Sequence, residues 1–262
     1  MLSRLFQSQN ILAAEKTKKK ERIDVVLHEM GFVESRNAAK SLLMSGSVFV
    51  NGQKIDKAGK IISLDSEITI KDARPKYVGR GGLKLEKALK EFRIDVTDKV
   101  CLDIGSSTGG FTDCLLQHGA LRVHAIDVGY GQLDWKLRND PRVILKERLN
   151  ARYLKNEDIG ESVDLIVIDV SFISITKVIE PALAILKNGG ALIGLIKPQF
   201  ELGKGEVGKG GIVRDQEKHK AVVQKVQKFL EDIGLQDIET INSPILGAEG
   251  NKEFLVKAIK QS

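Results

Sequence analysis

The sequence predicts an α/β fold in which helices cover both faces of an open sheet, preceded by a small α+β module. After Gly79, short apolar strands alternate with helices, which is typical of a parallel sheet covered on both faces. Before Gly79, two helical segments precede short strands around Asn51-Gly52, a strong hairpin-turn signal. The 262 residues also exceed one typical domain. We therefore expect two domains.

The elements of the α/β domain follow from the apolar pattern. We expect strands at 100–104, 123–128, 143–148, 164–169 and 191–196, helices at 83–92, 110–118, 175–186 and 215–233, and late strands at 237–241 and 253–259. The expected boundaries are a disordered extension over 1–20, the module over 21–71, a linker over 72–78, and the α/β domain over 79–262.

Two helices are expected at the start of the small module. Ile23, Val26 and Leu27 fall at helical spacing, and Gly31 is a typical residue just past a helix end. Ser35 is a favourable N-cap for the second helix. The charge of this region is also distinctive, because residues 1–78 hold 14 Lys and Arg against 9 Asp and Glu, whereas the whole chain has a net charge of +6. This asymmetry indicates a polyanionic partner.

The module resembles the S4-like RNA-binding domain found in a ribosomal protein, pseudouridine synthases and some synthetases. The motifs that carry the resemblance are Arg22-Ile23-Asp24, the run from Ser35 to Lys40, Gly46, Val48 and Val50-Asn51-Gly52. The resemblance implies that four basic side chains face RNA phosphates: Arg22, Arg36, Lys40 and Lys54. RNA is therefore the expected partner of this end of the chain.

A glycine-rich turn follows the first predicted strand of the α/β domain, in the run Leu102-Asp103-Ile104-Gly105-Ser106-Ser107-Thr108-Gly109-Gly110. In an open α/β sheet, ligands bind at the carboxyl ends of the strands. The run lacks the Lys-Ser/Thr of a P-loop and the G-x-G-x-x-G of a dinucleotide fold. S-adenosylmethionine is favoured, because Asp103 supplies a carboxylate for its cationic groups. NAD and a glycine turn without a ligand remain as alternatives.

Two further polar residues suit the same ligand. Asp127 ends the next strand, where an acid suits a ribose diol. Asn150 follows the third strand and suits an adenine edge, although local capping is an equal alternative. The pattern resembles the class I (Rossmann-like) methyltransferase fold. The residues expected to hold S-adenosylmethionine are Asp103, Gly105, Ser106, Thr108, Gly109, Gly110, Asp127 and Asn150.

Four charged residues lie at positions that a solvated surface does not explain well. Asp169 and Lys197 end buried strands, Lys84 opens a helix, and Glu253 begins the last strand. The set resembles the Lys-Asp-Lys-Glu tetrad of FtsJ-type ribose 2′-O-methyltransferases. A ribose hydroxyl is a poor nucleophile, so its proton must be accepted during transfer. Which lysine accepts the proton is left open.

Nearly the whole chain from Lys18 onward resembles the TlyA family of haemolysin-A-like ribosomal RNA methyltransferases. The run Gly79-Arg80-Gly81-Gly82-Leu83-Lys84-Leu85, the glycine turn and Ile196-Lys197-Pro198-Gln199-Phe200-Glu201 carry this resemblance. It implies cytidine 2′-O-methylation of 16S or 23S ribosomal RNA, with Arg80 as a further RNA contact.

The remaining expectations concern partners and compartment. Cys101 and Cys114 show no metal-ligand spacing, so no metal is expected, and they suggest a reducing compartment. A cytoplasmic protein that acts on ribosomal subunits fits these features. No membrane contact is expected, because no apolar run approaches the roughly 18 residues of a membrane span. A membrane-acting haemolysin and a non-catalytic RNA-binding assembly factor are the alternative functions.

Overall fold

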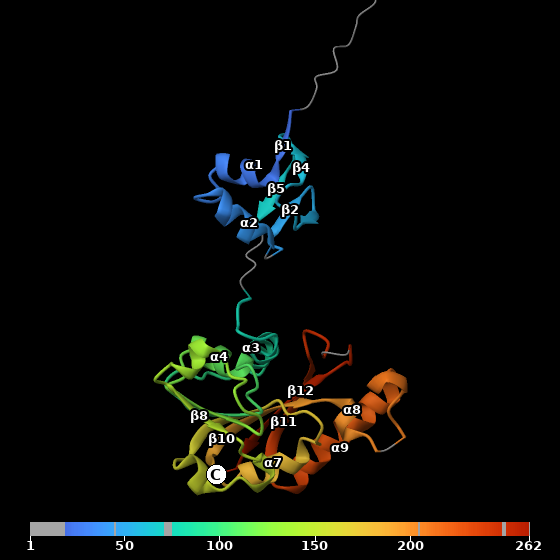
Figure 1. Cartoon of the computed structure of the whole chain (residues 1–262). Coiled ribbons are helices and arrows are strands. Elements are labelled where there is room, and N and C mark those ends of the chain that lie inside the picture. Colours follow the sequence, from blue (N-terminus) through green and yellow to red (C-terminus); the bar gives the residue numbers. More distant parts are fainter. Residues whose placement is uncertain (1–18, 45, 71–74, 204, 248–249, 262) are drawn as a thin grey trace, which may run out of the picture. The chain divides into compact units, whose positions relative to one another are not determined.

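The computed structural model describes residues 19–44, 46–70, 75–203, 205–247 and 250–261, and the chain divides into two compact units before Pro75 (Figure 1). Each unit has its own hydrophobic core. The predicted extension over 1–20 lies outside the described residues as far as residue 18. Lys20, in contrast, is part of a strand, β1 (Lys20–Arg22), so the ordered module starts slightly before the predicted boundary.

The first unit is the small α+β module that the sequence predicts. Its elements are α1 (Ile23–Glu29), α2 (Arg36–Met44), β2 (Val48–Val50), β3 (Gln53–Ile55), β4 (Ile61–Ser63) and β5 (Ile68–Ile70). β1 pairs with β4, and β2 lies between β3 and β5. The Ser35 hydroxyl accepts a hydrogen bond from the Ala38 N–H, as expected for an N-cap. Asn51 and Gly52 both have positive φ, the geometry of a tight hairpin turn.

Within the described residues, the second unit contains a seven-stranded sheet. Its strand order is β11 (Leu235–Asn242), β12 (Phe254–Lys260), β10 (Leu186–Ile196), β9 (Val163–Ile168), β6 (Val100–Ile104), β7 (Arg122–Asp127) and β8 (Val143–Glu147). β12 runs antiparallel to both of its neighbours, whereas β10, β9, β6, β7 and β8 pair in parallel. The predicted parallel α/β architecture is confirmed.

Helices cover both faces of this sheet (Figure 1). They are α3 (Gly81–Glu91), α4 (Gly110–Gln117), α5 (Trp135–Arg138), α6 (Asn156–Ile159), α7 (Thr176–Ala182), α8 (Pro198–Glu201) and α9 (Gln216–Asp232). None of these described helices is both long and apolar enough to cross a membrane. α7 is shorter than the predicted helix over 175–186, because Leu186 pairs with Val163 and already belongs to β10.

Two core clusters lie on opposite faces of the sheet, since successive strand residues alternate between them. Leu102 and Ile104 belong to one cluster, together with Val226 of α9, whereas Cys101 belongs to the other, together with Leu85 of α3. This alternation is the period of two expected for a strand with both faces buried. The sheet is therefore packed on both faces, and the carboxyl ends of its parallel strands have fixed positions.

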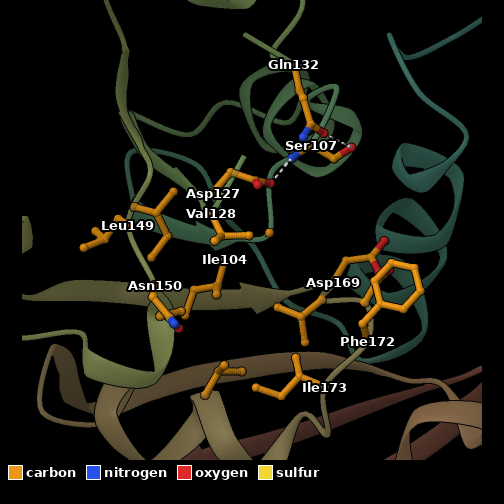
Figure 2. A pocket seen from close by; sticks show the side chains of 16 residues that line it. Ile104, Ser107, Asp127, Val128, Gln132, Leu149, Asn150, Asp169, Phe172 and Ile173 are labelled. Atoms are coloured by element: carbon orange, nitrogen blue, oxygen red, sulfur yellow. Dashed lines mark hydrogen bonds between the residues drawn. The ribbon is translucent and has the colours of Figure 1, made fainter. Parts of the chain in front are cut away.

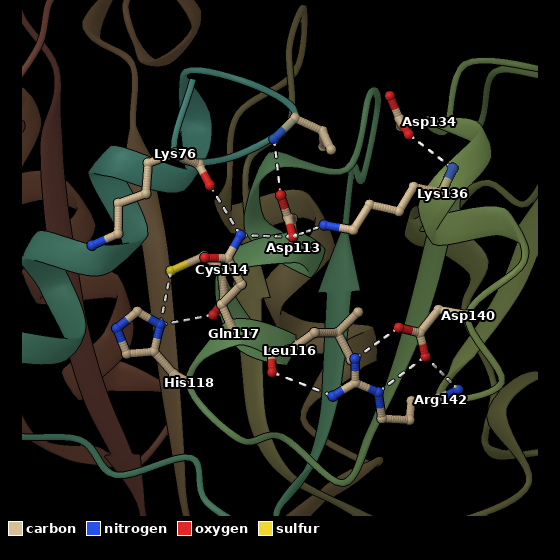
Figure 3. Close-up of polar contacts among 11 residues, drawn as sticks. Lys76, Asp113, Cys114, Leu116, Gln117, His118, Asp134, Lys136, Asp140 and Arg142 are labelled. Carbon is tan, nitrogen blue, oxygen red and sulfur yellow. Dashed lines mark hydrogen bonds and ion pairs between the residues drawn. The ribbon is translucent and has the colours of Figure 1, made fainter. Parts of the chain in front are cut away.

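Residues 75–78 are anchored to the second unit, so the predicted linker over 72–78 is too long at its C-terminal end. Tyr77 is buried in the core beside α3. The Val78 N–H donates to Asp113 Oδ2 at 2.9 Å, and Gln117 Nε2 donates to the Lys76 carbonyl at 3.0 Å (Figure 3). Residues 71–74 lie outside the described part of the chain.

Candidate active site

The glycine turn lies between β6 and α4 at the C-terminal edge of the sheet. Gly105 and Gly109 both have positive φ, which favours glycine. A Cβ atom at Gly105 would lie 2.6 Å from the Asp169 carbonyl oxygen, and one at Gly109 would lie 2.2 Å from a Leu137 side-chain carbon. A side chain at Gly105 would therefore push the loop away from the backbone that follows β9, and one at Gly109 would collide with the Leu137 side chain of α5.

A cavity of about 370 Å³ opens beside this turn (Figure 2). Its apolar wall includes Ile126, Val128 and Leu149, and its polar groups include Asp127 and Asn150. Pockets of this kind, with an apolar wall and a few placed polar groups, are typical of small-molecule sites. A flat heteroaromatic ring with an attached polar sugar fits this combination of groups.

Asp127 lines the cavity and binds two loop segments through its two carboxylate oxygens. Oδ2 accepts from the Ser107 N–H at 2.8 Å, and Oδ1 accepts from the Gly129 N–H at 2.7 Å (Figure 2 shows the Ser107 contact). A carboxylate has about four acceptor sites, so about two remain free for a ligand. Ser107 was not singled out in the sequence, although its place in the glycine turn was a signal.

Asn150 lies on the cavity wall and also caps a short helix. Its Oδ1 accepts from the Arg152 N–H at 3.1 Å, at the start of the 3₁₀ turn Ala151–Tyr153. The local capping alternative is therefore realised, and it leaves the amide N–H₂ of Asn150 as a donor at the cavity.

A second cavity, of about 220 Å³, adjoins the first. The two share Gly105, Ser107, Asp169 and Ser171 in their walls. This smaller cavity is also lined by residues 79–81, part of the glycine turn, Phe111 and Lys197. Together the cavities form a two-part site with an apolar lobe and a polar lobe, and Lys197 lies on the wall of the polar lobe.

Asp103 is fully buried beside α4 and is absent from the described walls of both cavities. Because Ile104 faces the larger cavity, the alternation along β6 turns Asp103 toward α4, where Thr112 Oγ1 donates to Oδ2 at 2.6 Å. Burial raises the pKa of Asp103 to about 7. Its other oxygen, Oδ1, has no hydrogen-bond partner among the described residues, and a contact of this carboxylate with the cofactor stays a prediction.

The other predicted cofactor residues divide between the two lobes. Gly105, Asp127 and Asn150 line the apolar lobe, and Gly105, Ser106, Thr108 and Gly110 line the polar lobe. Gly109 is absent from both described walls and instead allows Leu137 to pack closely.

Two of the four predicted catalytic residues meet at the boundary of the lobes. Lys197 Nζ lies 2.7 Å from Asp169 Oδ1, with side chains 11% and 21% exposed. The ammonium also donates to Ser171 Oγ at 2.9 Å. The contact with Asp169 is an ion pair without good hydrogen-bond geometry, because Asp169 Oδ1 has no hydrogen-bond partner among the described residues. Ser171 was missed in the sequence.

The other two predicted catalytic residues form a second ion pair. Lys84 Nζ of α3 donates to Glu253 Oε2 at 2.6 Å, with side chains 10% and 3% exposed. Ile196 pairs with Phe254 across β10 and β12, so Lys197 and Glu253 are the next residues at the same end of the sheet. The tetrad thus consists of two ion pairs at one sheet edge.

Glu201 and Phe172 are further features of the site; neither was predicted to have a role there, although Glu201 ends the run that begins at Ile196. Glu201 is buried and accepts from Ser174 Oγ at 2.6 Å and from the Ile175 N–H at 2.7 Å. It therefore ties α8, which follows Lys197, to the loop that follows Asp169. Phe172 has positive φ and is 91% exposed, with its ring 5.2 Å from that of Phe200.

The predicted RNA-facing arginines of the small module have a structural partner. Arg22 and Arg36 bind the fully buried Asp24 at 2.9 and 3.0 Å, and their own side chains stay about half exposed. The hydrogen bond from Arg22 is the largest cause that holds the pKa of Asp24 well below its usual range. Lys40 and Lys54 are exposed. Arg80, also predicted to contact RNA, lines the polar lobe of the second unit.

The sheet order with one reversed strand, and the two-part site at its C-terminal edge, define the class: a methyltransferase of the class I fold. The family model of FtsJ-like methyltransferases matches residues 77–260, and the S4 domain model matches residues 21–68. The chain belongs to the FtsJ-like methyltransferases and, within them, to the TlyA family that the following relatives represent.

The 16S/23S rRNA (cytidine-2′-O)-methyltransferase TlyA of Mycobacterium tuberculosis is 41% identical to this chain, over 91% of the chain and 89% of its own length. Hemolysin A of Brachyspira hyodysenteriae is 46% identical, over 91% and 99%. A solved structure of a candidate hemolysin from Streptococcus thermophilus has a TM-score of 0.71 and 44% identity, over 94% of this chain and 90% of that one.

Proposed function

We propose that this protein transfers a methyl group from S-adenosylmethionine to the 2′-hydroxyl of a cytidine in 16S or 23S ribosomal RNA, in the cytoplasm. The observation that carries the proposal is the Lys197–Asp169 ion pair at the boundary between the two lobes. The relatives named as rRNA (cytidine-2′-O)-methyltransferases support the choice of substrate.

The two-part site fits S-adenosylmethionine. Asp127 would hold the ribose diol, the Asn150 amide would meet the adenine edge, and Ile126 and Leu149 would pack on the ring. The polar lobe, with the start of α4 at Gly110, would hold the amino-acid end, whose carboxylate is stabilised by a helix N-terminus. When bound, the sulfonium supplies an electrophilic methyl group.

The charged residues at the sheet edge would supply a proton acceptor for the ribose hydroxyl. A ribose hydroxyl is a weak nucleophile and gains strength as its proton is accepted. Lys197 in its neutral form would accept that proton at Nζ, and Asp169 would stabilise the ammonium that results. The buried Lys84–Glu253 pair would hold the neighbouring strand end in place and keep a second cation near the site.

The small module would anchor the RNA. Its family match, its exposed Lys40 and Lys54 and the half-exposed Arg22 and Arg36 suit contacts with phosphates. Such contacts raise affinity without reading the base, so the choice of nucleotide would depend on the methyltransferase unit.

The test is transfer of tritium from labelled S-adenosylmethionine to ribosomal subunits that lack this modification, followed by mapping of ribose methylation. Lys197→Ala should reduce transfer about 10²- to 10⁴-fold, the range of general-base contributions, while cofactor binding stays unchanged. Lys197→Arg should not restore transfer, because a guanidinium stays protonated. Near-normal transfer by Lys197→Ala, or label found on a base instead of a ribose, would reject the proposal.

A further inference from the structure

Ser171 contacts the amine of Lys197 and lines both lobes of the site. The Lys197 ammonium donates to Ser171 Oγ at 2.9 Å and lies 2.7 Å from Asp169 Oδ1. Ser171 is also one of the residues shared by the walls of the two cavities. Two oxygen atoms from one loop therefore surround a single amine at the place where the lobes join.

These two oxygens affect the direction in which the lone pair of a neutral Lys197 amine points. A neutral amine has two N–H groups and one lone pair, whereas an ammonium has three N–H groups and no lone pair. Ser171 Oγ accepts one N–H of the amine, and Asp169 attracts a second N–H through the ion pair, so the two oxygens together restrict the direction of the lone pair. With Asp169 alone, the amine could rotate about that single contact.

We propose that Ser171 is a positioning residue that directs the lone pair of neutral Lys197 toward the ribose hydroxyl. The proposal rests on the proposed function and adds a residue to its proton transfer. During transfer the bond between the methyl carbon and O2′ forms as the bond between that carbon and sulfur breaks. The proton leaves O2′ for Lys197 Nζ, which becomes an ammonium, and the sulfur keeps the electron pair of the broken bond.

The loop that carries Ser171 is held in place relative to Lys197. The Asp169 N–H donates to the Ile104 carbonyl at 3.0 Å, which fixes the start of the loop to β6. Glu201 binds Ser174 Oγ and the Ile175 N–H, which fixes the far end of the loop to α8. Since α8 directly follows Lys197, both partners of the Lys197–Ser171 contact have fixed backbones.

The charged groups around Lys197 explain why an uncharged hydrogen-bond acceptor, the Ser171 hydroxyl, suits this position. The charged groups nearby are Asp169 at the end of β9, Arg80 on the wall of the same lobe, and the Lys84–Glu253 pair from α3 and the start of β12. The Phe200 ring of α8 lies 5.9 Å from Nζ. A second carboxylate in place of Ser171 would favour the ammonium strongly, whereas a hydroxyl directs the amine with a smaller effect on its charge.

The first test measures how readily the Lys197 amine is acetylated as a function of pH, in protein without RNA. Trace acetic anhydride acetylates neutral amines, and peptide mass spectrometry reports the acetylation of Lys197 as a function of pH. An acceptor favours the ammonium over the neutral amine, so Ser171→Ala should move the midpoint for Lys197 about 0.5–1 pH unit lower. Ser171→Thr keeps the hydroxyl and should keep the wild-type midpoint. Equal midpoints for Ser171→Ala and wild type would overturn the proposal.

The second test measures methyl transfer in single turnovers with saturating S-adenosylmethionine and ribosomal subunits. Because the cofactor is saturating, Ser171→Ala should slow transfer about 10-fold or more at the pH plateau through the chemical step, with an unchanged melting temperature. Ser171→Thr should restore most of the rate. A slow Ser171→Ala variant whose Lys197 midpoint has not moved would indicate a purely structural role and overturn the proposal.

The two tests separate this proposal from the proposed function. If wild-type protein methylates no ribose and the acetylation midpoint still moves in Ser171→Ala, the proposed function fails and the Lys197–Ser171 contact stands. If wild-type protein methylates ribose and Ser171→Ala matches it in both tests, the role of Ser171 fails and the proposed function stands.

Discussion

The Lys84–Glu253 ion pair has a large predicted effect on stability, because both side chains are buried. Nζ and Oε2 are 2.6 Å apart, with side chains 10% and 3% exposed. Glu253→Gln would leave the Lys84 ammonium buried beside a neutral amide. Removal of one partner of a buried pair costs about 3–5 kcal/mol, because the remaining charge is uncompensated. At about 2–4 °C per kcal/mol, the melting temperature of the methyltransferase unit should fall by about 6–20 °C.

The matched control replaces both partners, as Lys84→Met with Glu253→Leu. Two apolar side chains of similar volume often preserve or increase stability where an ion pair was buried. The double variant should therefore melt near the wild-type temperature, or above it, and still transfer methyl groups poorly. Calorimetric melting and tritium transfer measure the two properties. A Glu253→Gln variant that melts like wild type would refute the reasoning about burial, and an active double variant would show that the pair is structural alone.

Asp127 and Asp103 both lie near the glycine turn, but we expect Asp127 to affect cofactor affinity and Asp103 to affect how stability depends on pH. Asp127→Asn removes an oxygen that accepts a backbone N–H, so the dissociation constant for S-adenosylmethionine should rise about 10-fold or more in calorimetry. Asp95→Asn, which alters a carboxylate bound to the Thr97 N–H at a distant turn, should leave it unchanged. Because burial raises the folded pKa of Asp103 to about 7, above an unfolded value of about 3.9, this group favours folding below pH 4 and loses that contribution as pH rises to 7. Asp103→Asn should therefore lose less stability than wild type between pH 5 and pH 8 in urea unfolding, and parallel losses would contradict the burial of a titrating Asp103.

The strand and helix pattern was predictable because each element has a strong local signal. β6 has apolar residues on both sides of Asp103 and glycines after it, and its predicted bounds match Val100–Ile104. The end of α7 was predicted poorly, since an apolar run such as 183–186 can continue a helix or begin a strand. The pairing of Leu186 with Val163, distant in sequence, decided between the two.

The residue types at the strand ends were also predictable, but their roles were less so. Asp169 and Lys197 end parallel strands, so topology alone brings them to one edge. The contact of Asp103 with Thr112 was not predictable, because a residue's position in a motif does not show which face of the sheet its side chain occupies. Arg22 and Arg36 were assigned to RNA from the resemblance to the S4-like domain, and the buried Asp24 that both bind is visible only once α1 and α2 pack.

The sequence by itself determined the two domains, the alternating α/β pattern, the glycine turn and the four charged residues of the tetrad. These features depend on local periodicity and on residue type, which are properties of short segments. Long-range packing, in contrast, divides the tetrad into two ion pairs, turns Asp103 toward Thr112 of α4, and brings Ser171 and Glu201 to the site. Those contacts join segments up to 169 residues apart, and their geometry depends on strand register and side-chain packing, which no local pattern records.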